Sequence, residues 1–129
     1  IADLNGATGT ATYHGHIAGD VYDRGNLRSV VGSFREDFNF NSRTGSTRLD
    51  FDRRIFANPA GTSSTLVGQA YASTVVSGGV TGRRTGRFTR PLNASGQPSG
   101  IVGGFRLQNQ ATDPATAYRA TGAFAGSER

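Results

Sequence analysis

The sequence predicts an all-β fold: one closed, eight-stranded, antiparallel up-and-down β-barrel with a packed aromatic interior. Two features of the whole chain support this fold. The glycine-studded segment Gly9–Gly19 near the N-terminus is echoed by Tyr118–Gly126 at the C-terminus. Closure makes the first and last strands of a barrel neighbours, which removes the exposed edges of an open sheet. No segment keeps a helical period for more than a turn or two, and turn residues punctuate the chain at short intervals.

A third observation is the recurring pattern of glycine, any residue, then phenylalanine. The pattern occurs at Gly32-Ser-Phe34, Gly86-Arg-Phe88, Gly103-Gly-Phe105 and Gly122-Ala-Phe124. A spacing of two residues puts the glycine and the ring on the same face of a strand. A small residue beside a large one fits the interior of a narrow barrel. We therefore expect the following rings to be buried: Phe34, Phe38, Phe88, Phe105 and Phe124.

Eight segments have the alternation, or the aromatic and β-branched composition, of strands. In chain order they are Thr10–Tyr22, Val30–Phe40, Gly45–Phe51, Arg54–Ala57, Leu66–Ala72, Gly82–Thr89, Gly100–Gln108 and Ala117–Ala125. The glycine–aromatic pattern runs through the first two and the last three. The third, fourth and fifth rest on alternation and composition alone. The last segment is expected to hydrogen-bond to the first.

Turn residues separate these segments. Short turns are predicted at Asp23–Asn26, Asn41–Gly45, Asn58–Gly61 and Ser77–Gly79, and two longer exposed loops at Pro91–Gly100 and Asn109–Thr116. One residue breaks the apolar pattern, because Glu36 shares a strand face with Phe34 and Phe38. Either a bulge intervenes there, or Glu36 is buried with an arginine partner.

The composition sets further limits. The chain has 129 residues, no cysteine and no methionine. Its length suits one domain, and the lack of cysteine excludes disulfides and thiolate chemistry. Because the chain does not begin with a start codon, we expect Ile1–Thr8 to be a linker from a signal peptide or a preceding domain, with the barrel over residues 9–129. No apolar run is long enough to span a membrane as a helix.

The formal charge is +5, and all fourteen basic residues are arginine. The densest basic run is Gly82–Arg90. On a strand, Arg84 and Arg90 share the face of Phe88, while Arg83 and Arg87 lie on the opposite face. The remaining arginines are scattered among acidic residues, whereas nucleic-acid-binding proteins usually present a continuous basic stripe. Binding to nucleic acid is therefore not expected.

Only two histidines are present, His14 and His16, and they share one face of the first strand. Such a pair could hold a metal or offer a haem ligand. However, Tyr13 and Ile17 occupy the other face, so the histidines are expected to point outward, and no acidic residue or cysteine lies at ligand spacing. No catalytic motif organises the serine, histidine and aspartate residues, so we expect no enzyme and no cofactor.

The chain resembles transferrin-binding-protein-B-like β-barrel domains, which also occur in FecR-type and haemophilin-like secreted bacterial proteins. The resemblance rests on an ordered set of motifs: Gly9-Thr-Ala-Thr-Tyr13-His-Gly15-His, Asp37-Phe38-Asn-Phe40-Asn-Ser-Arg43-Thr-Gly45, Gly86-Arg-Phe88, Gly103-Gly-Phe105 and Tyr118-Arg-Ala-Thr-Gly122-Ala-Phe124-Ala-Gly126. It implies an eight-stranded barrel with binding activity, in an extracellular, cell-surface or periplasmic setting. The lipoprotein cysteine, second lobe and handle domain of that family are not recognised, so transferrin is not carried over as the partner.

These observations lead to three hypotheses of function. The first is a surface domain that binds a protein partner through its loops and an arginine-rich face. Its candidate contact residues are Arg83, Arg84, Arg87, Arg90, Asn93, Gln97, Gln110 and Asp113. The second is a lipocalin-like carrier of a small ligand or haem, which needs an open interior. The third is a structural subunit that assembles with other copies through unpaired strand edges.

Overall fold

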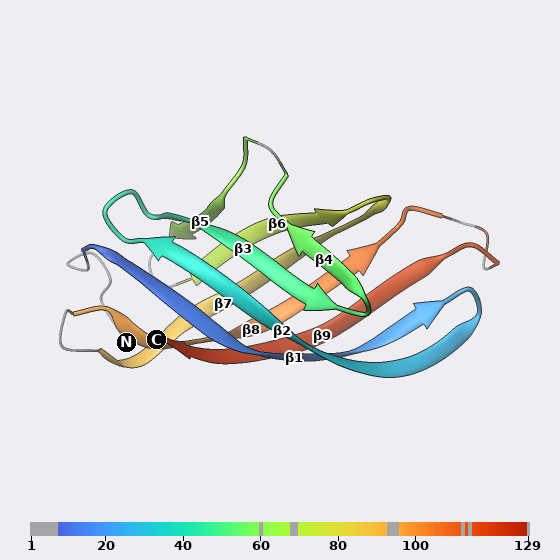
Figure 1. Ribbon diagram of the computed structural model, residues 1–129, viewed down its shortest axis with the longest axis horizontal. Coiled ribbons are helices and arrows are strands. Elements are labelled where there is room, and N and C mark those ends of the chain that lie inside the picture. Colours follow the sequence, from blue (N-terminus) through green and yellow to red (C-terminus); the bar gives the residue numbers. More distant parts are fainter. Residues whose placement is uncertain are drawn as a thin grey trace.

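The computed structural model describes residues 8–59, 61–67, 70–92, 96–111, 113 and 115–128. These residues form an all-β fold without helices (Figure 1). The nine strands are β1 Thr10–Asp23, β2 Asn26–Asn39, β3 Thr44–Phe51, β4 Arg54–Ala57, β5 Ser64–Val67, β6 Ala70–Ser77, β7 Val80–Leu92, β8 Pro98–Gln108 and β9 Tyr118–Glu128. A search of the described residues for a helix that could cross a membrane finds none. Apart from Thr8, the predicted linker lies outside these residues.

The nine strands close into an eight-stranded antiparallel barrel, as predicted. Pairing runs from β1 through β2 to β3, then through β4 and β5 to β6, and on through β7 and β8 to β9. Strand β9 pairs back onto β1. The short strands β4 and β5 share one place in the wall, because both pair with β3 on one side and with β6 on the other. Nine strands therefore occupy eight positions around the barrel.

The predicted strand Leu66–Ala72 is wrong. Strand β5 ends at Val67, and β6 begins at Ala70 and pairs antiparallel with it. The error has a physical cause: Leu66 and Tyr71 are cross-strand partners, and both point into the barrel. Apolar residues on the two arms of a tight hairpin can thus give a run that reads as one continuous strand.

The first and last strands pair over their length, as expected from their similarity. In the β1–β9 register, Gly15 lies opposite Gly126 and Gly19 lies opposite Gly122. Two glycines facing each other bring the two backbones together without a Cβ between them, which leaves space for rings from other strands. The first and last strands thus close the barrel (Figure 1).

The interior is filled by rings that lie over glycines of neighbouring strands. All eight phenylalanines are buried, including the five that were predicted. Four of them lie directly opposite a glycine: Phe34 faces Gly15, Phe38 faces Gly45, Phe105 faces Gly122, and Phe124 faces Gly103. The glycine–phenylalanine pattern seen along single strands therefore works across strands, where each glycine makes room for the ring of its neighbour.

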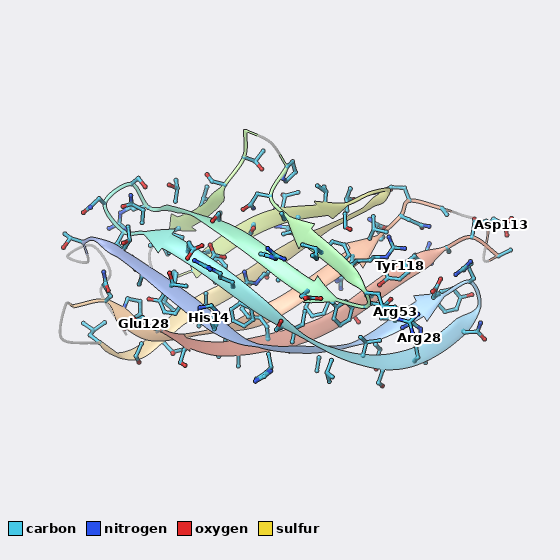
Figure 2. All side chains as sticks on the ribbon, viewed as in Figure 1. His14, Arg28, Arg53, Asp113, Tyr118 and Glu128 are labelled. Carbon is cyan, nitrogen blue, oxygen red and sulfur yellow. The ribbon has the colours of Figure 1, made fainter. Side chains whose placement is uncertain are left out.

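One end of the barrel is held by a cluster of polar side chains around Asp52. Its carboxylate forms an ion pair with Arg28 of β2 and accepts a 2.7 Å hydrogen bond from the Tyr118 hydroxyl of β9. Asp52 and Arg53 both have positive φ, of 54° and 61°, and form the tight turn between β3 and β4. Figure 2 shows Arg28, Arg53 and Tyr118 together at this end. The cluster ties three hairpins to one another.

The ring-on-glycine packing makes a testable prediction. A Cβ at Gly103 would lie 2.7 Å from the Phe124 ring and closer still to the Thr85 carbonyl oxygen. Gly103→Ala should therefore lower the free energy of unfolding by about 1–3 kcal/mol, because the wall must move to accept the methyl group. Chemical denaturation measures this loss. Gly79→Ala is the control, since nothing lies within 4 Å of its Cβ position; equal losses in the two variants would contradict the packing account.

Candidate functional site

A charged pair is buried at the centre of the barrel. Glu36 of β2 and Arg84 of β7 are fully buried, and Arg84 Nη1 donates a hydrogen bond of 2.9 Å to Glu36 Oε1. Of the two alternatives for Glu36, burial with an arginine partner is confirmed, because β1 and β2 pair without a bulge through this position. Arg84 therefore cannot contact a partner on the outer surface, and its assignment to the contact residues is wrong.

Aromatic faces surround the Arg84 guanidinium. Its Cζ atom lies 4.0 Å from the ring centroid of Phe124, 4.5 Å from Phe34 and 5.3 Å from Tyr71. Such cation–π contacts are stronger away from water than at exposed sites. The rings that fill the barrel thus also hold its one fully buried arginine among the described residues.

Hydroxyl groups support the carboxylate from the other side. Thr47 donates a hydrogen bond to Glu36 Oε1, Ser73 donates to the Thr47 hydroxyl at 3.0 Å, and the Ser64 and Thr47 hydroxyls lie 2.7 Å apart. These residues come from β3, β5 and β6, so the network joins strands on the wall that β4 and β5 share.

Asn58 bridges the break in the wall between β4 and β5. Its Oδ1 accepts a hydrogen bond of 2.8 Å from the Thr47 backbone, and its Nδ2 donates to Ser73 Oγ at 2.8 Å and to the Thr74 carbonyl at 3.0 Å. Here β3 and β6 have no strand between them, and the side-chain amide takes the place of a ladder of backbone bonds. Asn58 thereby continues the wall across the break.

Burial determines the electrostatics of the pair. Desolvation raises the pKa of Glu36 to about 7, although Arg84 and the hydroxyl groups act in the opposite direction. Desolvation also lowers the pKa of Arg84 below its usual value. Because rings and hydroxyls fill the surrounding space, the pair has the character of a structural centre, and it is not a ligand site open to solvent.

The outer face carries a second set of charges. We call it the arginine face: the outward positions of β6, β7, β8 and β9. Its exposed arginines are Arg83, Arg87, Arg106 and Arg119. None of them forms an ion pair within the described residues, and the sequence has no aspartate or glutamate from residue 53 to residue 112. Positive charge therefore collects on one side of the barrel.

The other predicted contact residues do not form one surface. Gln97 is buried and donates hydrogen bonds to the carbonyls of Thr8 and Thr10, at the end of the barrel where β1 begins. Gln110 and Asp113 are exposed in the β8–β9 connection, which lies at the opposite end (Figures 1 and 2). The Arg90 side chain and Asn93 lie outside the described residues. Consecutive connections of an up-and-down barrel alternate between its ends, so the two loops cannot share a face.

The histidines point outward, as predicted. His16 is exposed and His14 is half-buried, while Tyr13 and Ile17 fill the inner face of β1. The cross-strand neighbour of His14 on β2 is Arg35, a cation that disfavours a metal ion nearby. No group of three metal-ligating side chains exists among the described residues. The arrangement offers no support for a metal or haem ligand set.

Sequence reasoning missed Arg106 and Arg119 as part of the arginine face. Both are single charges far along the chain from the basic run at Gly82–Arg90. The register places Arg106 directly opposite Arg83, and Arg119 on the next strand. Their strand parity was the available signal, because each lies at an odd offset from a buried ring, Phe105 or Phe124.

Comparisons with known proteins locate similar folds. No model of a protein family matches the sequence, and no curated protein sequence does either. HpuA from Kingella denitrificans, solved in complex with human haemoglobin, is similar with a TM-score of 0.57 and 19% identity over 95% of this chain. A double mutant of Transferrin Binding Protein B from Haemophilus parasuis is similar with a TM-score of 0.65 and 14% identity over 94% of this chain.

These similarities support the fold predicted from the sequence motifs, a barrel like that of transferrin-binding protein B. The chain spans 43% of the length of HpuA and 25% of the length of Transferrin Binding Protein B. The likeness to FecR-type and haemophilin-like proteins stays a prediction. At these identities the similarity concerns the barrel itself.

The buried carboxylate predicts an unusual dependence of stability on pH. Since the pKa of Glu36 is raised to about 7 in the folded protein, the folded state keeps a proton that the unfolded chain loses above about pH 4.5. The contribution of Glu36 to the free energy of unfolding is therefore full below pH 4.5. It falls by about 3 kcal/mol as the pH rises through 7. Denaturation between pH 4.5 and 8 measures this, and Glu36→Gln should remove the slope. A wild-type slope in Glu36→Gln would contradict the assignment, and the exposed Asp50→Asn serves as the control.

Proposed function

We propose that this chain is a non-enzymatic domain of a bacterial cell-surface protein, and that it binds a protein partner through the arginine face. The proposal rests on the difference between the side chains on the inner and outer faces of the barrel wall. The inside is filled by rings and by the Glu36–Arg84 pair, while the described outward positions of β6 to β9 present arginines without neutralising carboxylates. We therefore expect the partner to bind to the outer face of the barrel.

The chemistry of the arginine face favours an acidic protein surface as the partner. Arginine forks bind carboxylates bidentately and lose little freedom in doing so. A face of one sign also speeds the encounter with an oppositely charged partner. The similar proteins are named as a binder of transferrin and as a haemoglobin receptor. These names support a host protein as the class of partner.

The filled interior counts against a carrier of a small ligand or haem. Phe34, Phe124 and Tyr71 enclose Arg84 at the centre, and the Asp52 cluster ties one end. A carrier needs an empty interior of at least ligand size. Assembly through unpaired edges also loses support, because β1 and β9 pair with each other.

The proposal predicts a charge-dependent interaction. Human haemoglobin and human transferrin are the first probes, immobilised for biolayer interferometry against the barrel, followed by host serum fractions. Arg87→Glu should weaken binding at least about tenfold, because it places a like charge against an acidic partner. Arg48→Glu, which makes the same change of charge on β3, should leave binding within about twofold.

Two outcomes would contradict the proposal. One is that no protein in serum or among the purified probes is retained by the wild-type barrel. The other is that Arg87→Glu and Arg48→Glu weaken binding equally, which would indicate a response to net charge alone and no role for the arginine face.

A further inference from the structure

Three guanidinium groups gather at one end of the arginine face. Arg83 of β7 lies directly opposite Arg106 of β8 in the register. One step further along, Arg119 of β9 lies opposite Gln108 of β8. All three arginines are exposed, and they line one shallow groove on the outer surface. Directly opposite residues on one face have Cβ atoms about 4.5–5.5 Å apart, and diagonal neighbours, such as Arg119 and Arg106, about 7–8 Å apart, so the three long side chains can reach one point.

Neutral hydrogen-bonding groups surround the three arginines. Thr74 lies opposite Arg83, and Thr121 lies opposite Arg106. Thr81 lies opposite Gln108, and both line the same groove. The groove thus combines three cations with three hydroxyl groups and an amide.

Among the described residues, no carboxylate forms an ion pair with these arginines. The outward positions of β6 to β9 that the structure describes contain neither aspartate nor glutamate. Asp20 of β1 is one strand beyond Thr121, and its carboxylate accepts a 3.0 Å hydrogen bond from Ser29 of β2, on the side away from β9. Like charges directly opposite each other on a sheet destabilise it. Repulsion between Arg83 and Arg106 therefore lowers the stability of the folded protein, and a bound anion would remove this repulsion.

We propose that Arg83, Arg106 and Arg119 form a binding site for a phosphate-type dianion. A single carboxylate carries one charge and fills one arginine fork, whereas a phosphate group presents at least three acceptor oxygens and up to two charges. Two facing forks and the nearby hydroxyls can each take a separate oxygen. The site shares Arg83, Arg106 and Arg119 with the arginine face proposed to bind a protein. The two proposals are tested separately, because the anion site is tested at Arg106 with phosphate and the protein partner at Arg87.

The same chemistry has two sources, a free phosphate ion or a phosphate monoester on a lipid headgroup. Two arms of one experiment separate them. In the first, the arginine Nε–Hε resonances are followed by NMR during titration with sodium phosphate, with sodium chloride of equal ionic strength as the reference. In the second, the barrel is co-sedimented with phosphatidylcholine vesicles with and without phosphatidic acid.

In the first arm, we expect the Arg83, Arg106 and Arg119 signals to shift and saturate with phosphate but not with chloride, while Arg48 on β3 stays unchanged. Arg106→Gln should raise the apparent Kd for phosphate at least tenfold, and Arg48→Gln should not change it. Selective sedimentation with phosphatidic acid that Arg106→Gln abolishes would support the site with a lipid source.

A second readout does not depend on the ligand. Without phosphate, Arg106→Gln should match or exceed the wild-type Tm, because it relieves the repulsion from Arg83 and leaves the fold intact. The inference is overturned if all exposed arginines shift alike, if chloride gives the same shifts, or if Arg106→Gln binds as the wild type does in both arms. Each of these outcomes leaves the test of the protein partner unaffected.

Discussion

The ion pair between Glu36 and Arg84 is the constraint on which the rest of the barrel depends. A guanidinium is costly to bury, and it persists only with a partner and with groups that replace its water. Here the carboxylate supplies the partner, and the faces of Phe34, Tyr71 and Phe124 supply the surroundings. These rings in turn need space, which glycines on the neighbouring strands provide. The glycine content is therefore a consequence of what the barrel encloses.

Strand alternation separates this structural centre from the proposed binding surface. On β7, Arg84 points inward and its neighbour Arg83 points outward, so adjacent identical residues have different roles. The inner arginine stabilises the wall through Glu36. The outer one has no ion-pair partner among the residues that the structure describes, and it faces another arginine, Arg106. A filled barrel can thus give its whole interior to stability and leave recognition to its outer face.

Local pattern predicted much of this fold, whereas long-range register had to come from the structure. The period of two and the glycine–aromatic spacing predicted the barrel, the buried rings and the pairing of the terminal strands. They could not show that Leu66–Ala72 contains a chain reversal, because Leu66 and Tyr71 face each other across it. They also could not choose Arg84 from fourteen arginines as the partner of Glu36, or bring Arg106 beside Arg83. Those pairings depend on residues far apart in the chain.

The most direct test of this account is a double-mutant cycle between Glu36 and Arg84, measured by chemical denaturation at pH 7. The variants are Glu36→Leu, Arg84→Met and the two combined. Glu36→Leu should cost about 3–5 kcal/mol, because it leaves the buried Arg84 charge without its partner. Arg84→Met should cost less, because Glu36 without Arg84 takes up a proton and stays neutral. The double variant should be more stable than the sum of the two losses predicts, by about 2–3 kcal/mol. Additive losses, or an Arg84→Met variant as stable as the exposed Arg83→Met, would contradict the claim that this pair organises the barrel.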